Sequence, residues 1–167
     1  MALTEVRLQN FRSFSDETVL RFHSGLNVLV GANGTGKSNV LDGVLFALTQ
    51  EASKLRARWW AELQHRDGAK RGPCAVALRI CPPGGKGQPD VAIMAHLKDD
   101  CSRQLKLNGK PATIAEVRAA LREVRLEVED TTFAIRQNAA SRVLDSEHLI
   151  GQVTWPPLIP CEPWLLA

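Results

Sequence analysis

The segment that most constrains this chain is residues 31–38, which read GANGTGKS. It matches the pattern G-x-x-x-x-G-K-[ST] in full, with an additional glycine, Gly34, inside the loop. In this pattern, glycine backbone amides converge on phosphate oxygens, the lysine places a charge near the β- and γ-phosphates, and the final hydroxyl ligates magnesium. The sequence therefore predicts a phosphate-binding loop in which Lys37 and Ser38 have these roles.

The residues on either side of the loop provide the context that the pattern requires. Residues 26–30, LNVLV, form a nearly continuous apolar run, which is typical of a strand covered on both faces. After the loop, apolar residues recur at helical spacing (Val40, Leu41, Val44, Leu45 and Leu48). The local order is therefore predicted to be central strand, tight loop and helix, so an accidental glycine turn is a poor explanation of the match.

Several further segments predict a β-rich domain. Apolar and polar residues alternate in residues 3–8 and 18–22, and strands are also expected at 74–81, 91–97 and 103–107. Residues 82–89, PPGGKGQP, read as a loop, and Asn108-Gly109 is a strong signal for a tight turn.

A second helix is predicted after this turn. Thr113 suits an N-cap position, with Glu116 three residues later, and residues 114–124 place Ile114, Val117 and Leu121 on one face.

The most basic stretch of the chain is residues 54–71, which we expect to form a shorter helix and a loop. It holds six cationic residues (Lys54, Arg56, Arg58, Arg66, Lys70 and Arg71) against Glu62 and Asp67. Such a stretch can neutralise nucleic-acid phosphates, although a solvated face is the commoner use. Trp59 and Trp60 could stack on bases, but packing inside the protein or against a partner is the more frequent role.

The composition is that of an ordinary globular domain, with 44% apolar and 23% charged residues. No apolar run reaches the length of a membrane span, and the N-terminal residues lack the apolar block of a secretory signal, so we expect a soluble, intracellular protein without membrane contact. The four cysteines (Cys74, Cys81, Cys101 and Cys161) include no C-x-x-C pair, which favours reduced thiols. The net charge of +3 does not by itself indicate nucleic-acid binding.

Taken together, several segments resemble a known family. Residues 6–48, VRLQNFRSFSDETVLRFHSGLNVLVGANGTGKSNVLDGVLFAL, resemble the N-terminal head lobe of the SMC, RecF and RecN group of ABC-type ATPases. Residues 54–80 resemble the segment after the P-loop helix in SMC proteins, most closely the cohesin type, and 133–145, FAIRQNAASRVLD, look like the family's Q-loop. The resemblance covers about residues 3–148. It implies an α/β P-loop NTPase fold with a β-rich subdomain and flanking helices.

The resemblance also implies roles for single residues. The residues that would wrap the triphosphate of ATP are Asn33, Gly34, Thr35, Gly36, Lys37, Ser38 and Asn39. Arg12 stands at the basic position of the family's F-K/R-S turn and would approach the nucleotide from the side. Gln137 is the Q-loop candidate and would, with Ser38, hold Mg²⁺ and orient the attacking water. Arg56 matches an arginine linked in some members to DNA-stimulated turnover.

Each of the last three assignments has a plainer alternative. Gln137 and Arg12 could be ordinary polar surface residues, and Arg56 could belong to a solvated face. In cohesin-type relatives a pair of lysines precedes the strand matched by residues 104–109, whereas here Lys98 is followed by Asp99 and Asp100. That regulatory feature does not transfer.

Some parts that the family needs for hydrolysis have no match in these residues. The family takes its second magnesium carboxylate and water-positioning residue from a C-terminal lobe, and its signature loop from a second head. The sequence has no apolar run ending in Asp-Glu, no SGG signature and no heptad array. We therefore expect a truncated half-head that binds ATP and Mg²⁺ and hydrolyses only with a C-terminal lobe and a partner head.

Two alternatives stay open at this point, namely a non-catalytic fragment that pairs with a C-terminal lobe, and a small P-loop kinase. For the domain organisation we expect the lobe at residues 1–150 and an irregular tail, rich in proline and tryptophan, at 151–167. The family resemblance implies a location at the chromosome, in a nucleus or a nucleoid.

Overall fold

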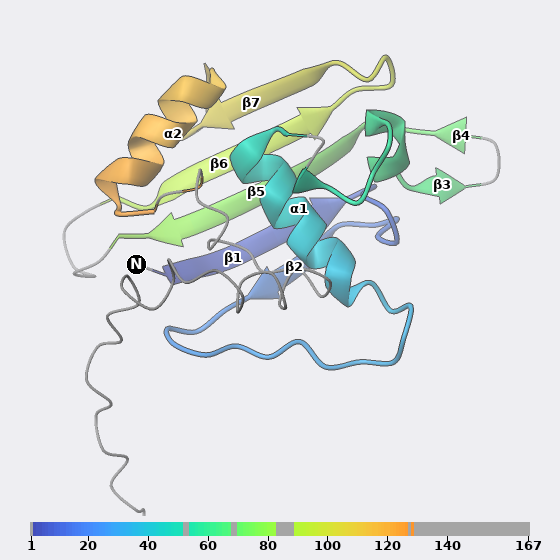
Figure 1. Ribbon diagram of the computed structural model, residues 1–167, viewed down its shortest axis with the longest axis horizontal. Coiled ribbons are helices and arrows are strands. Elements are labelled where there is room, and N and C mark those ends of the chain that lie inside the picture. The colour runs from blue at the N-terminus through green and yellow to red at the C-terminus, as the bar shows by residue number, and fades with distance from the viewer. Residues whose placement is uncertain (1, 52–53, 68–69, 83–88, 127, 129–167) are drawn as a thin grey trace, which may run out of the picture. The chain divides into compact units, whose positions relative to one another are not determined.

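A six-stranded antiparallel sheet forms the centre of the part of the chain that the computed structural model describes, residues 2–51, 54–67, 70–82, 89–126 and 128 (Figure 1). The strand order is β2-β1-β5-β6-β7-β8. The strands are β1 (Ala2–Gln9), β2 (Thr18–Arg21), β5 (Cys74–Cys81), β6 (Val91–Leu97), β7 (Arg103–Leu107) and β8 (Lys110–Ala112). Five of them lie within one residue of the predicted bounds, because their alternating pattern is a local signal.

One face of the sheet is apolar and is covered by helices. In β5, Val76, Leu78 and Ile80 are buried, while Arg79 between them is exposed. In the neighbouring β6, Ile93 and Leu97 are buried in the same way. Figure 1 shows α1 (Lys37–Thr49) crossing this face over β1, β5 and β6, and α2 (Ile114–Glu123) beside β6 and β7. The core therefore lies between the sheet and these two helices.

Helix α1 follows the phosphate loop as predicted. Val40, Leu45 and Leu48 are buried, whereas Leu41 and Val44 are only half-buried. The helix ends at Thr49 and is capped by Gln50, whose φ of 53° is left-handed and whose N–H donates to the Phe46 carbonyl oxygen at 3.3 Å. The helical spacing gave the correct element, and the sheet determines which of its residues are fully covered.

The start of α2 confirms the predicted N-cap. The Thr113 hydroxyl accepts from the Glu116 N–H at 3.3 Å, and the Glu116 carboxylate accepts from the Thr113 N–H at 2.7 Å. Hydrogen bonds from the Thr113 N–H and, at 2.9 Å, from the Thr113 hydroxyl hold the pKa of the Glu116 carboxylate below its usual value, with the backbone bond as the largest cause. Both halves of a capping box are therefore present.

The turn at Asn108-Gly109 is also confirmed. Both residues have positive φ, 49° and 81°, as a two-residue hairpin turn with right-handed strand twist requires. The turn pairs Leu107 with Lys110 and so starts β8, an edge strand that the strand predictions did not include. Pro111 conceals that strand in the sequence, because proline is tolerated in sheets only at such edges.

The prediction of a central strand at residues 26–30 is wrong. These residues form no strand in the described structure, and Leu26, Val28 and Val30 are 94%, 72% and 89% exposed. A buried strand needs hydrogen-bonding neighbours on its edges and apolar cover on its faces. No element among the described residues supplies either to this segment.

The short helix expected within residues 54–71 is present as four residues of 3₁₀ helix, and a hairpin follows it where a loop was expected. The segment contains the 3₁₀ helix η2 (Trp60–Leu63) and a two-stranded hairpin of β3 (Arg66–Asp67) and β4 (Lys70–Arg71). Arg12 N–H donates to the Leu63 carbonyl oxygen at 2.8 Å, and His65 N–H donates to the Asn10 carbonyl oxygen at 2.9 Å. Backbone hydrogen bonds to the turn after β1 therefore hold this segment, in place of the hydrogen bonds of a longer helix.

Several predictions lie outside the described residues. They concern Gln137, Cys161 and the domain boundary at residue 150.

Cys74, Cys81 and Cys101 are free thiols, and burial raises the pKa of Cys74 to about 12. Neither helix in the described part of the chain has the length and apolarity needed to cross a bilayer.

The contact between α1 and the sheet leads to a first prediction. A Cβ on Gly43 would lie 2.5 Å from Cδ2 of Leu8, which is fully buried. Replacing Gly43 with alanine should therefore lower the free energy of unfolding by about 1–3 kcal/mol, despite the gain of about 1 kcal/mol in helix propensity. Urea unfolding monitored by circular dichroism measures this change.

The matched control is the double variant with Leu8→Val. It shortens the side chain that the new methyl group meets, so its loss of stability should be smaller than the sum of the two single losses. An increase in stability in Gly43→Ala alone would contradict the packing described here.

Candidate nucleotide-binding site

The loop of residues 31–38 has the backbone geometry that a phosphate cradle needs. Gly34 and Gly36 have φ values of 85° and 95°, in the left-handed region that other residues rarely adopt. Gly36 is the N-cap of α1, and in the described structure no side chain caps this helix end. The first N–H groups and the positive end of the helix dipole are therefore directed to the loop, which is the arrangement that binds anions.

Lys37 folds back over the loop. Its Nζ donates to the carbonyl oxygens of Gly31 and Ala32, both at 2.7 Å. The Thr35 hydroxyl donates to the same Ala32 oxygen at 2.9 Å. The loop is therefore held closed by its own side chains, with the ammonium group at its mouth.

Gly36 is buried, but predicted ligands on either side of it are open to solvent. Asn33 and Ser38 are both exposed. The Ser38 hydroxyl lies in the first turn of α1, next to Lys37, where a magnesium ligand is expected. The loop thus presents backbone donors, one ammonium and one hydroxyl on the same surface.

The turn after β1 packs on this loop. Asn39 Nδ2 donates to the Ser13 hydroxyl at 2.9 Å. A Cβ on Gly36 would lie 2.5 Å from Ser13 Oγ and 3.2 Å from Cζ of Phe14. Gly36 is therefore required twice, by its backbone angle and by the close approach of this turn.

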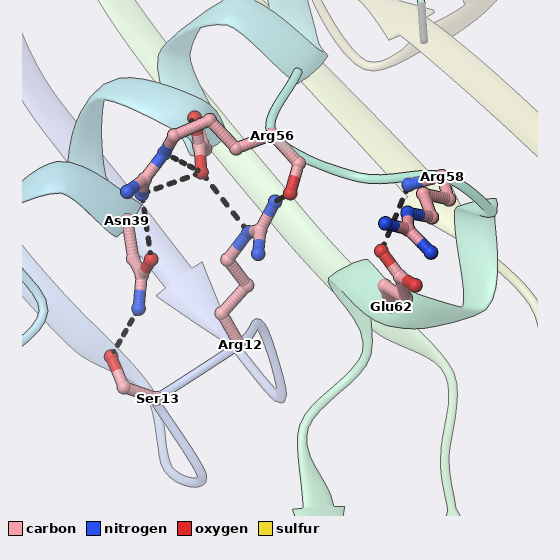
Figure 2. A network of polar contacts seen from close by, with 7 residues as sticks. Arg12, Ser13, Asn39, Arg56, Arg58 and Glu62 are labelled. Atoms are coloured by element: carbon pink, nitrogen blue, oxygen red, sulfur yellow. Dashed lines mark hydrogen bonds and ion pairs between the residues drawn. The ribbon is translucent and has the colours of Figure 1, made fainter.

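A buried carboxylate joins the two predicted arginines. Asp42, in the second turn of α1, is 1% exposed. Arg12 Nε lies 3.1 Å from Asp42 Oδ2, and Arg56 Nη2 lies 2.9 Å from the same oxygen. Figure 2 shows both guanidinium groups converging from different segments, with Asn39 and Ser13 beside them.

The two arginines differ in their surroundings. The Arg12 side chain is 15% exposed and that of Arg56 is 48% exposed. Burial lowers the pKa of Arg12, and the nearby Asp42 partly offsets this effect. Arg12 Nε is close to the carboxylate without the angle of a hydrogen bond, whereas Arg12 Nη2 donates to the Arg56 carbonyl oxygen at 2.8 Å. Arg12 therefore also holds the backbone of the segment that carries Arg56.

The structure brings together most of the predicted site residues and adds two that were missed. Arg12, Asn39 and Arg56 meet around Asp42, and Ser13 completes the contact. The sequence did carry a signal for Asp42, because it is a carboxylate inside the apolar helix pattern VLDGVLFAL. Nothing in the sequence identifies its partners.

Only part of the basic stretch 54–71 is available to an external ligand. Lys54 pairs with Glu51 at 3.3 Å, and Arg56 is held by Asp42. Trp60 packs against Phe46, with ring centroids 6.1 Å apart, and carries the Arg103 guanidinium 4.3 Å above its ring. Trp59 is 69% exposed. One tryptophan is therefore used for packing inside the protein, and the other lies on the surface.

Comparison with known proteins agrees with this geometry. The family model for the RecF/RecN/SMC N terminal domain matches residues 2–130. This chain belongs to that family. It is 31% identical over 153 residues to structural maintenance of chromosomes protein 4 of Caenorhabditis elegans, covering 86% of this chain and 10% of the relative.

It is also 31% identical over 125 residues to the chromosome partition protein Smc of Gloeobacter violaceus, covering 72% of this chain and 11% of that protein. The chain thus spans about a tenth of the length of these SMC relatives.

Solved SMC heads have the same fold. A structure described in terms of ATP-driven dimerization and DNA-stimulated activation of SMC ATPases has a TM-score of 0.77 at 23% identity, covering 90% of this chain and 95% of that one. An Smc head bound to the C-terminal winged-helix domain of ScpA has a TM-score of 0.76 at 24% identity, covering 87% and 47%. The expected SMC/RecF-type head fold is confirmed, whereas the cohesin subgroup stays a prediction.

The two loop glycines with positive φ, Gly34 and Gly36, allow a matched test of the site geometry. Alanine at Gly34 or Gly36 would adopt a strained positive φ, which costs about 1–2 kcal/mol. At Gly34 nothing lies within 4 Å of the new methyl group, whereas at Gly36 it would meet Ser13. Gly36→Ala should therefore lose about 1–2 kcal/mol more free energy of unfolding than Gly34→Ala, as measured by urea denaturation. Equal losses would show that the turn after β1 does not press on the loop.

Proposed function

We propose that this chain is the ATP-binding N-terminal half of an SMC-type head in chromosome maintenance or DNA repair. In this proposal it hydrolyses ATP only together with a C-terminal lobe and a second head. The observation that carries the proposal is the loop of residues 31–38, with its two left-handed glycines and the uncapped start of α1. Membership of the RecF/RecN/SMC N-terminal family supports the same assignment.

The residues of the loop suit ATP and Mg²⁺. An ammonium group has three donors, and Lys37 uses two of them on loop carbonyl oxygens, so one remains for an anion at the loop mouth. The exposed Ser38 hydroxyl is the proposed magnesium ligand. When bound, magnesium neutralises charge on the β- and γ-phosphates. Roles for Gln137 as a magnesium ligand and for Arg12 as a nucleotide contact remain predictions from the family resemblance.

The exposed segment 26–30 is the proposed contact with the C-terminal lobe. Val28 and Val30 are 72% and 89% exposed, although their apolar character suits a covered strand. An apolar segment whose backbone groups make no hydrogen bond to another described residue can pair with a strand of another lobe by β-augmentation. Pairing would hydrogen-bond the backbone directly before the phosphate loop and so fix the start of that loop.

The names of the relatives indicate the setting. They are described as chromosome maintenance and chromosome partition proteins, so the proposed location is the chromosome, in a nucleus or a nucleoid. Contact with DNA through residues 54–71 is a separate prediction. It is supported by the exposed Arg58 and Arg66, while Lys54 and Arg56 are engaged in ion pairs.

A non-catalytic role is the second candidate, and the exposed segment 26–30 favours it because pairing needs no nucleotide. In this case the chain pairs with a C-terminal lobe without binding ATP. Nucleotide binding by the isolated chain separates the two candidates. A self-contained P-loop kinase would require turnover by the purified chain alone.

The decisive test of the nucleotide site is Lys37→Ala. Loss of the only ammonium in the loop should weaken binding of a fluorescent ATP analogue, measured with millimolar magnesium, by about tenfold or more. Lys110→Ala, which removes an exposed lysine in β8, is the control and should bind as the unmodified chain does. Unchanged affinity in Lys37→Ala would refute the site assignment.

The partner proposal is tested with a C-terminal SMC head lobe expressed as a separate chain. Adding it should produce ATP turnover, and Val28→Asp should reduce the complex affinity at least about tenfold, because burying an unpaired charge is costly. Met94→Asp introduces the same charge at an exposed apolar position in β6 and should leave the complex intact. Equal complex formation by both variants would rule out segment 26–30 as the contact.

A further inference from the structure

Asp42 is the least exposed of the buried polar residues in the described part of the chain. It is 1% exposed on a helix whose neighbouring positions, Leu45 and Phe46, belong to the core. A buried carboxylate persists only when it is paired and hydrogen-bonded. The fold therefore requires the two arginines that pair with Asp42. In turn, the carboxylate can hold these arginine side chains in place.

The two arginines that contact Asp42 are held in place differently. Arg12 is fixed through its backbone, since its N–H donates to the Leu63 oxygen at 2.8 Å and its carbonyl oxygen lies 2.6 Å from His65 Nδ1. Arg56 contacts Asp42 through its side chain, with Nε at 3.3 Å and 3.2 Å from the two oxygens and Nη2 at 2.9 Å from one of them. Asp42 thus determines where the Arg56 guanidinium lies.

The same guanidinium reaches the phosphate loop. Arg56 Nη2 also donates to Asn39 Oδ1 at 3.1 Å, and Asn39 Nδ2 donates to Ser13 Oγ at 2.9 Å (Figure 2). Because Ser13 follows Arg12 in the chain, the contacts form a closed ring through Arg12, Asp42, Arg56, Asn39 and Ser13. The ring links the turn after β1, the first two turns of α1 and the segment that carries Arg56.

We propose that Asp42 is a positioning residue, whose buried carboxylate holds Arg56 against Asn39 and thereby orients the first turn of α1 at the phosphate loop. Asp42 itself does not lie in the loop, so it acts on a bound nucleotide through Arg56 and Asn39. This inference rests on the proposed nucleotide-binding function. The carboxylate suits this task because its negative charge pairs with two guanidinium groups at once and its oxygens also accept the hydrogen bonds of Arg56, whereas a neutral amide carries no charge to offset either arginine.

The first arm of the test needs no nucleotide. In ¹⁵N spectra of the full chain, Asp42→Asn should accelerate water exchange of the Arg56 Nε–H by about tenfold, since it loses a charge-assisted hydrogen bond. It should also shift the Asn39 side-chain amide signal in the same direction as Arg56→Gln does. Asp90→Asn, the same chemical change at an exposed aspartate 3.9 Å from Arg79, should change neither signal.

The second arm measures ATP affinity in a double-mutant cycle. Asp42→Asn and Arg56→Gln should each weaken binding about tenfold, and the double variant should be no weaker than either single one. An Arg56 or Asn39 signal that is unchanged in Asp42→Asn overturns the proposal. Affinity losses that multiply overturn it as well, because they would show that Asp42 does not act through Arg56.

The two arms separate this inference from the proposed function. If the unmodified chain binds no ATP, the proposed function fails, and the spectra still decide whether Asp42 holds Arg56 against Asn39. If Asp42→Asn does not fold, Arg56→Gln removes the same link from its half-exposed side. The Asn39 amide signal then decides, and an unshifted signal in Arg56→Gln overturns the proposal.

Discussion

The packing of α1 on the sheet is the interaction on which the rest of this structure depends. The absence of a side chain at Gly43 lets the helix approach Leu8 in β1 closely, and Phe46 fills the space between Phe11 and Trp60. This contact fixes the position of the helix, and therefore also the position of its N terminus and of Asp42. The positions of the phosphate loop and of Asp42 with its two arginines therefore both depend on one close approach between a helix and a strand.

The parts of the fold that the sequence predicted are those whose causes are local. Thr113 and Glu116 cap α2 through contacts three residues apart, and Asn108-Gly109 makes its turn by tolerating positive φ. Whether residues 26–30 form a strand does not depend on such local causes. An apolar run indicates that a segment would be stable in a covered position, whereas the cover itself must come from other elements.

The residues of the candidate site likewise fall into those with a local sequence signal and those without one. The loop pattern predicts roles for Gly34, Gly36, Lys37 and Ser38 from the sequence alone, because consecutive residues make a phosphate cradle. The pairing of Asp42 with Arg12 and Arg56 joins segments 30 and 14 residues away along the chain, and charge alone does not select such partners. A count of cations in residues 54–71 likewise overstated the charge that is available to DNA, since ion pairs hold Lys54 and Arg56.

The exposure of residues 26–30 has a consequence for the behaviour of the protein in solution. Residues 26–30 are mainly Leu and Val, and their backbone groups make no hydrogen bond to another described residue, so the segment can pair with a compatible strand or with the same segment of a second molecule. Such self-pairing is second order in protein concentration, so dilution favours the single chain and concentration favours edge-to-edge association. In the proposed complex, a C-terminal lobe therefore competes with copies of this chain for residues 26–30, and the ratio of the two in solution decides which assembly forms.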